Sequence, residues 1–194
     1  MSNQMSEDLE KIDEYLSVIQ KRILAPIQNT GIQRYCTVTL LLLFAAMDGL
    51  GKLLVPDDTA GPNQRIRGFL DYMSGDYEVS KKELLSLRHS LVHNAINVES
   101  FLSHTEIGGD WHLKKIGADL IYVNTMVMYK DFVDSFTRFR SEIQHDLVMM
   151  RRAADRLAWV ETADPLEWGK DNPPDQMDNA TPTPPPPVRF IYAK

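Results

Sequence analysis

The chain has 194 residues, of which 43% are hydrophobic, and its formal net charge is −6. This length and apolar content fit one globular domain, and the single cysteine, Cys36, excludes both an internal disulfide framework and a cysteine-based zinc cluster. The negative charge argues against loose, nonspecific nucleic-acid binding, which depends on basic residues.

Two helices are predicted first. From Glu7 to Ile27 apolar residues recur at helical spacing, and Pro26 is expected to end that helix. The acidic start is unlike a secretory signal, so we expect a cytoplasmic protein. The next helix, from about Gln33 to Leu54, is apolar nearly all round and is predicted to lie at the centre of a bundle. Its most apolar run, Val38 to Met47, is shorter than a bilayer span, so we predict no membrane segment.

A Pro- and Gly-rich loop follows, and a short helix is predicted from Arg65 to Met73. The stretch "SGDYEVS" is expected to form a second loop that ends at Ser80. Ser80 and Glu83 have the spacing of a capping box, in which each side chain caps a backbone N–H of the helix start. A long helix is therefore predicted from Ser80 to about Ile96.

Beyond this helix the hydrophobic period changes. The Gly-Gly-Asp sequence at 108–110 is expected to turn between two strands of a small β-hairpin. A helical pattern returns from Asn124 to Val160 and is predicted to be one long helix that closes the bundle. Residues 161–194 are rich in Pro, Asp and Asn and are predicted to be a disordered tail. The predicted organisation is a helical domain, 1–160, and a Pro-rich acidic tail, 161–194.

The stretch "LRHSLVHNA", residues 87–95, places cations on an otherwise apolar helix. At about 100° per residue, one apolar stripe faces the core and is made of Leu84, Leu87, Leu91 and Ala95. A second stripe contains Leu85, Val92 and Ile96, with Arg88 on one border and His89 and His93 on the other. One bundle face needs only one stripe, so the second predicts contact with another helix, such as that of a second copy in a homodimer.

The chemistry of these residues suits RNA. Arginine binds phosphate bidentately, and histidine moves protons near neutral pH. Together they could cleave RNA through attack of the ribose 2′-hydroxyl without a metal or cofactor. Asp48 is a candidate partner for the buried cations. The alternative is a structural cluster in which Arg88 pairs with an acid and the histidines pack or cap.

"ELLSLRHSLVHNA" resembles the signature helix of the HEPN superfamily, and "LLLFAAMDGLGKLL" is similar to the second helix of several members. The resemblance implies an all-α, HEPN-like antiparallel helical bundle, here with the small β-hairpin insertion. It implies a metal-independent endoribonuclease, often a toxin or defence effector, with a composite site across a dimer interface. Arg88, His93 and His89 would be catalytic, and Asp48 and Asn94 supporting. Other members only bind, so the alternative is an inactive module for a nucleotide, RNA or protein partner.

Other patterns are weaker. His89 and His93 are four apart, as in some zinc sites, but Ser90 stands where a metalloprotease has Glu, so no metal site is predicted. Arg138 and Arg140 lie near phenylalanines and could bind RNA, although a solvated face with ordinary ion pairs is the alternative. The scattered histidines are predicted to be surface or packing residues: His104, His112 and His145.

Overall fold

The computed structural model describes residues 2–29, 35–56, 59–94, 100–103, 109–115 and 121–162. Side chains are described for 4–29, 35–56, 59–92, 110–115 and 121–157. Contacts divide the chain into Met1–Val160 and Glu161–Lys194. Of the predicted Pro-rich tail, residues 161 and 162 are helical, and residues 163–194 lie outside the described residues.

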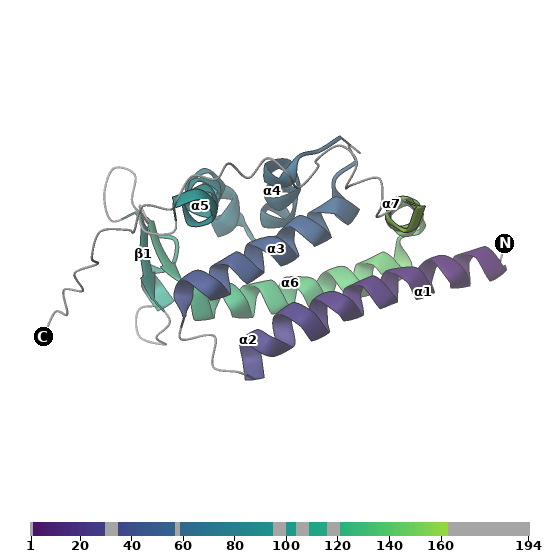
Figure 1. The fold of residues 1–194 in the computed structure, drawn as a ribbon, viewed down its shortest axis with the longest axis horizontal. Coiled ribbons are helices and arrows are strands. Elements are labelled where there is room, and N and C mark those ends of the chain that lie inside the picture. The colour runs from purple at the N-terminus through teal and green to yellow at the C-terminus, as the bar shows by residue number, and fades with distance from the viewer. Residues whose placement is uncertain are drawn as a thin grey trace, which may run out of the picture. The chain divides into compact units, whose positions relative to one another are not determined.

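The first unit is mostly helical, as predicted (Figure 1). Its elements in chain order are α1 (Ser2–Ile19), η1 (Gln20–Leu24), α2 (Ala25–Asn29), α3 (Cys36–Leu54), α4 (Pro62–Met73), α5 (Gly75–Asn94), β1 (Ser100–Ser103), η3 (Gly109–Trp111), β2 (Ile121–Asn124), α6 (Thr125–His145) and α7 (Leu147–Thr162). The apolar helix α3 contacts α4, α5 and α6, and residues such as Leu40, Leu43, Met47 and Leu50 are fully buried. The prediction that this helix lies at the centre of a bundle is confirmed.

The N-terminal helix runs antiparallel to α6 (Figure 1). Asp13 of α1 pairs with Arg140 near the end of α6, at 3.1 Å. Further along, the carbonyl of Leu24 accepts a hydrogen bond from the hydroxyl of Tyr129, near the start of α6, at 3.4 Å. Increasing residue numbers on one helix therefore meet decreasing numbers on the other.

The prediction that Pro26 ends the first helix is wrong. Helical structure continues to Asn29 through the π-helical segment η1, where the N–H of Ala25 bonds to the carbonyl of Gln20, five residues back. A proline ring in a regular helix clashes with the carbonyl four residues earlier. We infer that the wider turn just before Pro26 relieves this clash, so the chain continues without a break.

The prediction of a loop from Ser74 to Ser80 is also wrong, since α5 begins at Gly75. The carbonyl of Ser74 accepts bonds from the N–H groups of Tyr77 at 3.1 Å and Glu78 at 3.3 Å. Asp76 and Glu78 in this first turn interact favourably with the positive end of the helix dipole, which stabilises the helix start. Ser80 is buried inside the helix and caps nothing, so the Ser80–Glu83 capping box does not form.

The predicted β-hairpin is corrected to a parallel pair. Ser100 to Ser103 of β1 pair in parallel with Ile121 to Asn124 of β2. The reversal lies elsewhere, in an antiparallel bridge between Lys115 and Ile121. Gly109 and Asp110, expected in the hairpin turn, instead form part of the 3₁₀ turn η3. Parallel strands cannot be joined by a two-residue hairpin turn.

The helix predicted from Asn124 to Val160 is two helices, α6 and α7. Asp146 lies between them in an extended conformation, and its Oδ1 accepts bonds from the N–H groups of Val148 at 2.9 Å and Met149 at 3.0 Å. This is an N-cap, which satisfies backbone donors that a helix start leaves open. The break turns α7 onto α3, where Nη1 of Arg152 bonds to the carbonyl of Leu54 at 3.3 Å.

Removing this cap should weaken the fold modestly. We expect Asp146→Ala to lower the free energy of unfolding by about 1 kcal/mol, because two backbone N–H groups of α7 lose their acceptor. Urea denaturation measures the change. Asp155→Ala removes the same charge from an exposed position of α7 and should change stability by less than about 0.5 kcal/mol. Equal losses in both variants would contradict the capping role.

Helix α3 is also long and apolar enough to cross a membrane by length and composition. It has 19 residues, and half of an apolar 18-residue stretch within it is buried inside the structure. The central helix of a soluble bundle passes the same test, so this is weak evidence for a membrane span.

Candidate functional site

Helix α5 carries the predicted catalytic residues of the signature motif. Arg88, His89, His93 and Asn94 all belong to it, and the helix ends at Asn94. The side chains of His93 and Asn94 lie outside the described residues, so the site can be built only from Arg88, His89 and their surroundings.

The side chain of Arg88, in α5, reaches the N-terminal end of α4. Its Nη1 donates a hydrogen bond to Oδ1 of Asn63 at 3.3 Å. A shallow pocket of about 300 Å³ is lined by Arg88 and by Gly61, Pro62, Asn63 and Gln64 at the start of α4. The N-terminus of a helix carries partial positive charge, which adds to that of the guanidinium. The pocket therefore has a positive field suited to an anion.

Asp48 does not approach Arg88 but binds Arg65. Its Oδ1 accepts from Nε of Arg65 at 2.7 Å and its Oδ2 from Nη2 at 3.1 Å, while Nη1 of Arg65 donates to the carbonyl of Ala60 at 2.8 Å. The hydrogen bond with Asp48 raises the pKa of Arg65. Burial, and then the Asp48 charge, raise the pKa of Tyr15. Asp48 thus joins α3 to α4 through Arg65, and its predicted partnership with the motif cations stays a prediction.

The second apolar stripe of the signature helix is partly exposed. Val92 is 49% exposed and Leu85 is partly buried against the core, while His89, on the rim of the stripe, is exposed. Ile96, the third predicted member, lies outside the described residues. Among the described residues of the stripe, the exposed apolar surface is therefore that of Val92, with Arg88 on one side and His89 on the other.

Arg138 and Arg140, the predicted RNA-binding arginines, have partners within the chain. Arg138 donates to the carbonyls of Tyr72 at 2.5 Å and Met73 at 3.2 Å, and its guanidinium lies 4.6 Å from the Tyr72 ring centre. Arg140 binds Asp13 and Gln20. These contacts tie α6 to α4 and to the N-terminal helix, and RNA binding by either residue stays a prediction.

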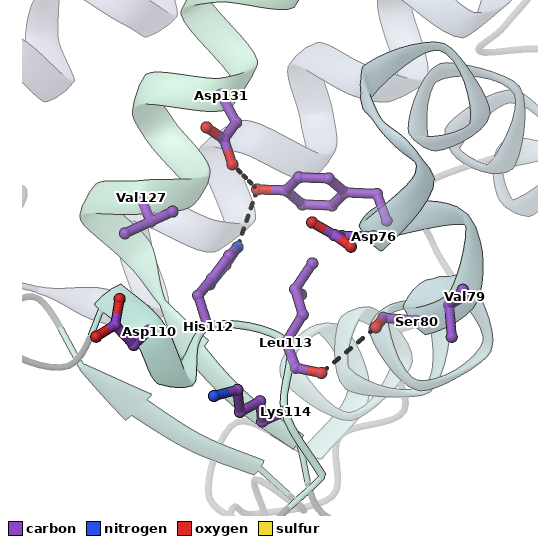
Figure 2. Close-up of a pocket in the computed structure, with 10 residues that line it drawn as sticks. Asp76, Val79, Ser80, Asp110, His112, Leu113, Lys114, Val127 and Asp131 are labelled. Atoms are coloured by element: carbon purple, nitrogen blue, oxygen red, sulfur yellow. Dashed lines mark hydrogen bonds between the residues drawn. The ribbon is translucent and has the colours of Figure 1, made fainter.

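The structure also contains a hydrogen-bonded chain that sequence reasoning missed. The backbone N–H of Asn124 donates to Nδ1 of His112 at 3.0 Å, so Nδ1 is an acceptor and the neutral ring carries its proton on Nε2. Nε2 lies 2.9 Å from the hydroxyl of Tyr77, and that hydroxyl donates to Oδ2 of Asp131 at 2.9 Å (Figure 2). The three side chains come from the turn that follows η3, from α5 and from α6.

Burial is the main cause of the pKa shifts of His112 and Tyr77 in this hydrogen-bonded network. It lowers the pKa of His112 to about 4, with Asp76 acting in the opposite direction. It raises the pKa of Tyr77, and the Asp131 charge adds to that effect. The imidazole is therefore neutral at pH 7. The spacing of apolar residues does not predict this hydrogen-bonded network, because Tyr77 is 35 residues from His112 and 54 residues from Asp131 in sequence.

Comparisons with protein-family models, curated proteins and solved structures find no match to this chain. The resemblance to the HEPN superfamily therefore depends on the motif residues alone.

Proposed function

We propose that this chain is a metal-independent endoribonuclease of the HEPN type in which Arg88 binds the scissile phosphate. The observation that carries the proposal is the hydrogen bonding of the Arg88 guanidinium. Among the described residues its one hydrogen bond is to a neutral amide oxygen at 3.3 Å, whereas Arg65 and Arg140 each bind a carboxylate. A partly exposed guanidinium without a carboxylate, beside a helix N-terminus, is suited to bidentate phosphate binding.

Helical geometry supports a site shared by two copies. At about 100° per residue, His89 and His93 lie about 100° and 140° around the helix from Arg88. A phosphate held by Arg88 is therefore turned away from the histidines of the same helix. A two-fold dimer formed over the Leu85 and Val92 surface would bring Arg88 of each copy toward the histidines of the other.

The proposed reaction transfers two protons and requires no metal ion. The ribose 2′-oxygen attacks phosphorus and the bond to the 5′-oxygen breaks, which leaves a 2′,3′-cyclic phosphate and a 5′-hydroxyl. One imidazole accepts the 2′-hydroxyl proton and another supplies a proton to the 5′-oxygen. We assign these roles to His93 and His89, place Asn94 as a supporting residue and give Arg88 the charge that develops on phosphorus.

The test is cleavage of single-stranded RNA in the presence of EDTA. We expect Arg88→Ala and His93→Ala each to lower the cleavage rate at least about 100-fold, because each removes a group that acts in the transition state. Arg67→Ala is the matched control, since Arg67 is an exposed arginine of α4 that does not line the Arg88 pocket. It should retain nearly full activity.

Two results would oppose the proposal: intact RNA under all conditions, or equal cleavage by the wild type and Arg88→Ala. RNA that binds in an Arg88-dependent way but stays intact would favour the alternative, an inactive binding module. One observation favours that alternative: both carboxylate oxygens of Asp48, a predicted supporting residue, accept hydrogen bonds from Arg65.

A further inference from the structure

A second pocket, of about 460 Å³, lies between the first turns of α5, the start of α6 and the segment from Asp110 to Lys114 (Figure 2). It shares no lining residue with the Arg88 pocket. Its size is within the range of small-molecule sites, which combine apolar walls with a few polar groups.

The wall of this pocket is both apolar and acidic. Val79, Leu113 and Val127 supply apolar surface, and Asp76, Asp110 and Asp131 supply three carboxylates. The lining cation is the ammonium of Lys114, which lies 5.6 Å from the centre of the Trp111 ring. His112 adds no positive charge, since its ring is neutral at pH 7. The excess of carboxylates opposes binding of an anion.

Asp131 distinguishes this pocket from a chance gathering of surface acids. Asp76 lies in the first turn of α5, where an acid stabilises the helix dipole whether or not a ligand binds. Asp131 lies in the second turn of α6 and receives no such benefit. In the described part of the chain its partner is the neutral hydroxyl of Tyr77, and it makes no ion pair. Burial, followed by the charges of Asp134 and Asp76, raises its pKa.

The position of Asp131 is also held firmly. Tyr77 is 1% exposed and its hydroxyl is fixed between Asp131 and His112. The backbone opposite is constrained as well, because Leu113 adopts a φ of 63°, which is uncommon for leucine, and its N–H bonds to the carbonyl of Tyr122 at 2.8 Å. A preorganised polar group in a pocket loses less entropy when a ligand binds.

We propose that this pocket binds a small organic cation, with its ammonium or guanidinium group at Asp131 and its alkyl part against Val127 and Leu113. A cation there would offset the repulsion between Asp131 and Asp76 and gain a charge-assisted hydrogen bond. A divalent metal fits less well, since no three His, Cys, Asp or Glu side chains in the described part of the chain are grouped to hold one. The inference is independent of the proposed ribonuclease activity.

Isothermal titration calorimetry of the full chain with 1,4-diaminobutane tests the proposal. The diamine should bind, and 1,4-butanediol, which has the same chain length without charge, should bind at least about 10-fold more weakly. Asp131→Asn keeps an oxygen that can accept the Tyr77 hydrogen bond but removes the charge, so it should weaken diamine binding at least about 10-fold. Asp110→Asn changes a residue of the short 3₁₀ segment η3, outside the α-helices, and should weaken binding several-fold.

Asp155→Asn is the control, because it removes one acid from an exposed position of α7 away from the pocket. It should leave diamine binding unchanged, as should Arg88→Ala, which separates this result from the ribonuclease test. The absence of diamine binding, equally tight binding of the diol, or equal weakening by Asp155→Asn and Asp110→Asn would each overturn the proposal.

Discussion

Gly51→Ala should lower the free energy of unfolding by about 3 kcal/mol, because α3 and α4 meet at this glycine with no room for a side chain. A Cβ atom built on Gly51 would lie 2.0 Å from the carbonyl oxygen of Arg65 and 2.4 Å from its carbonyl carbon. Both are backbone atoms, so no rotamer change relieves the overlap. The helices must separate, and the bond between Asp48 and Arg65 would be disturbed with them.

Urea denaturation at pH 7 measures this loss. Gly75→Ala is the matched control, since a Cβ at Gly75 meets nothing within 4 Å. That variant should be unchanged or slightly more stable, because alanine restricts the unfolded chain. If Gly51→Ala unfolded at the same urea concentration as the wild type, the close approach of α3 and α4 would be refuted.

Acid should remove a second large contribution to stability, that of neutral His112. Its pKa falls from 6.5 to about 4 in the folded chain. Folding therefore favours the neutral form, and the resulting stability is complete above pH 6.5 and lost as the pH falls through 4. The full difference is about 3 kcal/mol. Protonated Nδ1 would confront the N–H of Asn124, two donors with no acceptor between them.

The measurement is urea denaturation at pH 7 and at pH 4.5 for the wild type and His112→Asn. The variant should be less stable at pH 7, because it disturbs the bonds to Tyr77 and Asn124. Its stability should then fall less than that of the wild type between the two pH values. Asp131 acts in the opposite direction, since its raised pKa favours the protonated acid in the fold as the pH falls.

A control variant separates His112 from a general effect of acid. His145 is exposed and its Nδ1 lies 2.7 Å from the carbonyl of Ser141. His145→Asn should keep the pH dependence of the wild type. The same pH dependence in all three proteins would disprove the role assigned to His112.

The errors in the predicted elements share a cause. Ser80 has the residue type and spacing of an N-cap, but the backbone of Ser74 accepts the first hydrogen bonds and α5 starts earlier. Asp146 lies inside a helical pattern that continues across it, but its side chain caps α7 and the break lets Arg152 of α7 bind the carbonyl of Leu54 in α3. Pairing of β1 with β2 joins segments about 20 residues apart, which local patterns do not specify.

The sequence by itself determined the helical character of the chain, the central position of α3 and the placement of the motif on α5. These features depend on the spacing of apolar residues, which each helix satisfies locally. Only the tertiary structure decided that Asp48 binds Arg65 instead of Arg88, and that Tyr77, His112 and Asp131 meet at one pocket. Such pairings depend on how closely the helices approach, as at Gly51, and that distance is set by packing between distant segments.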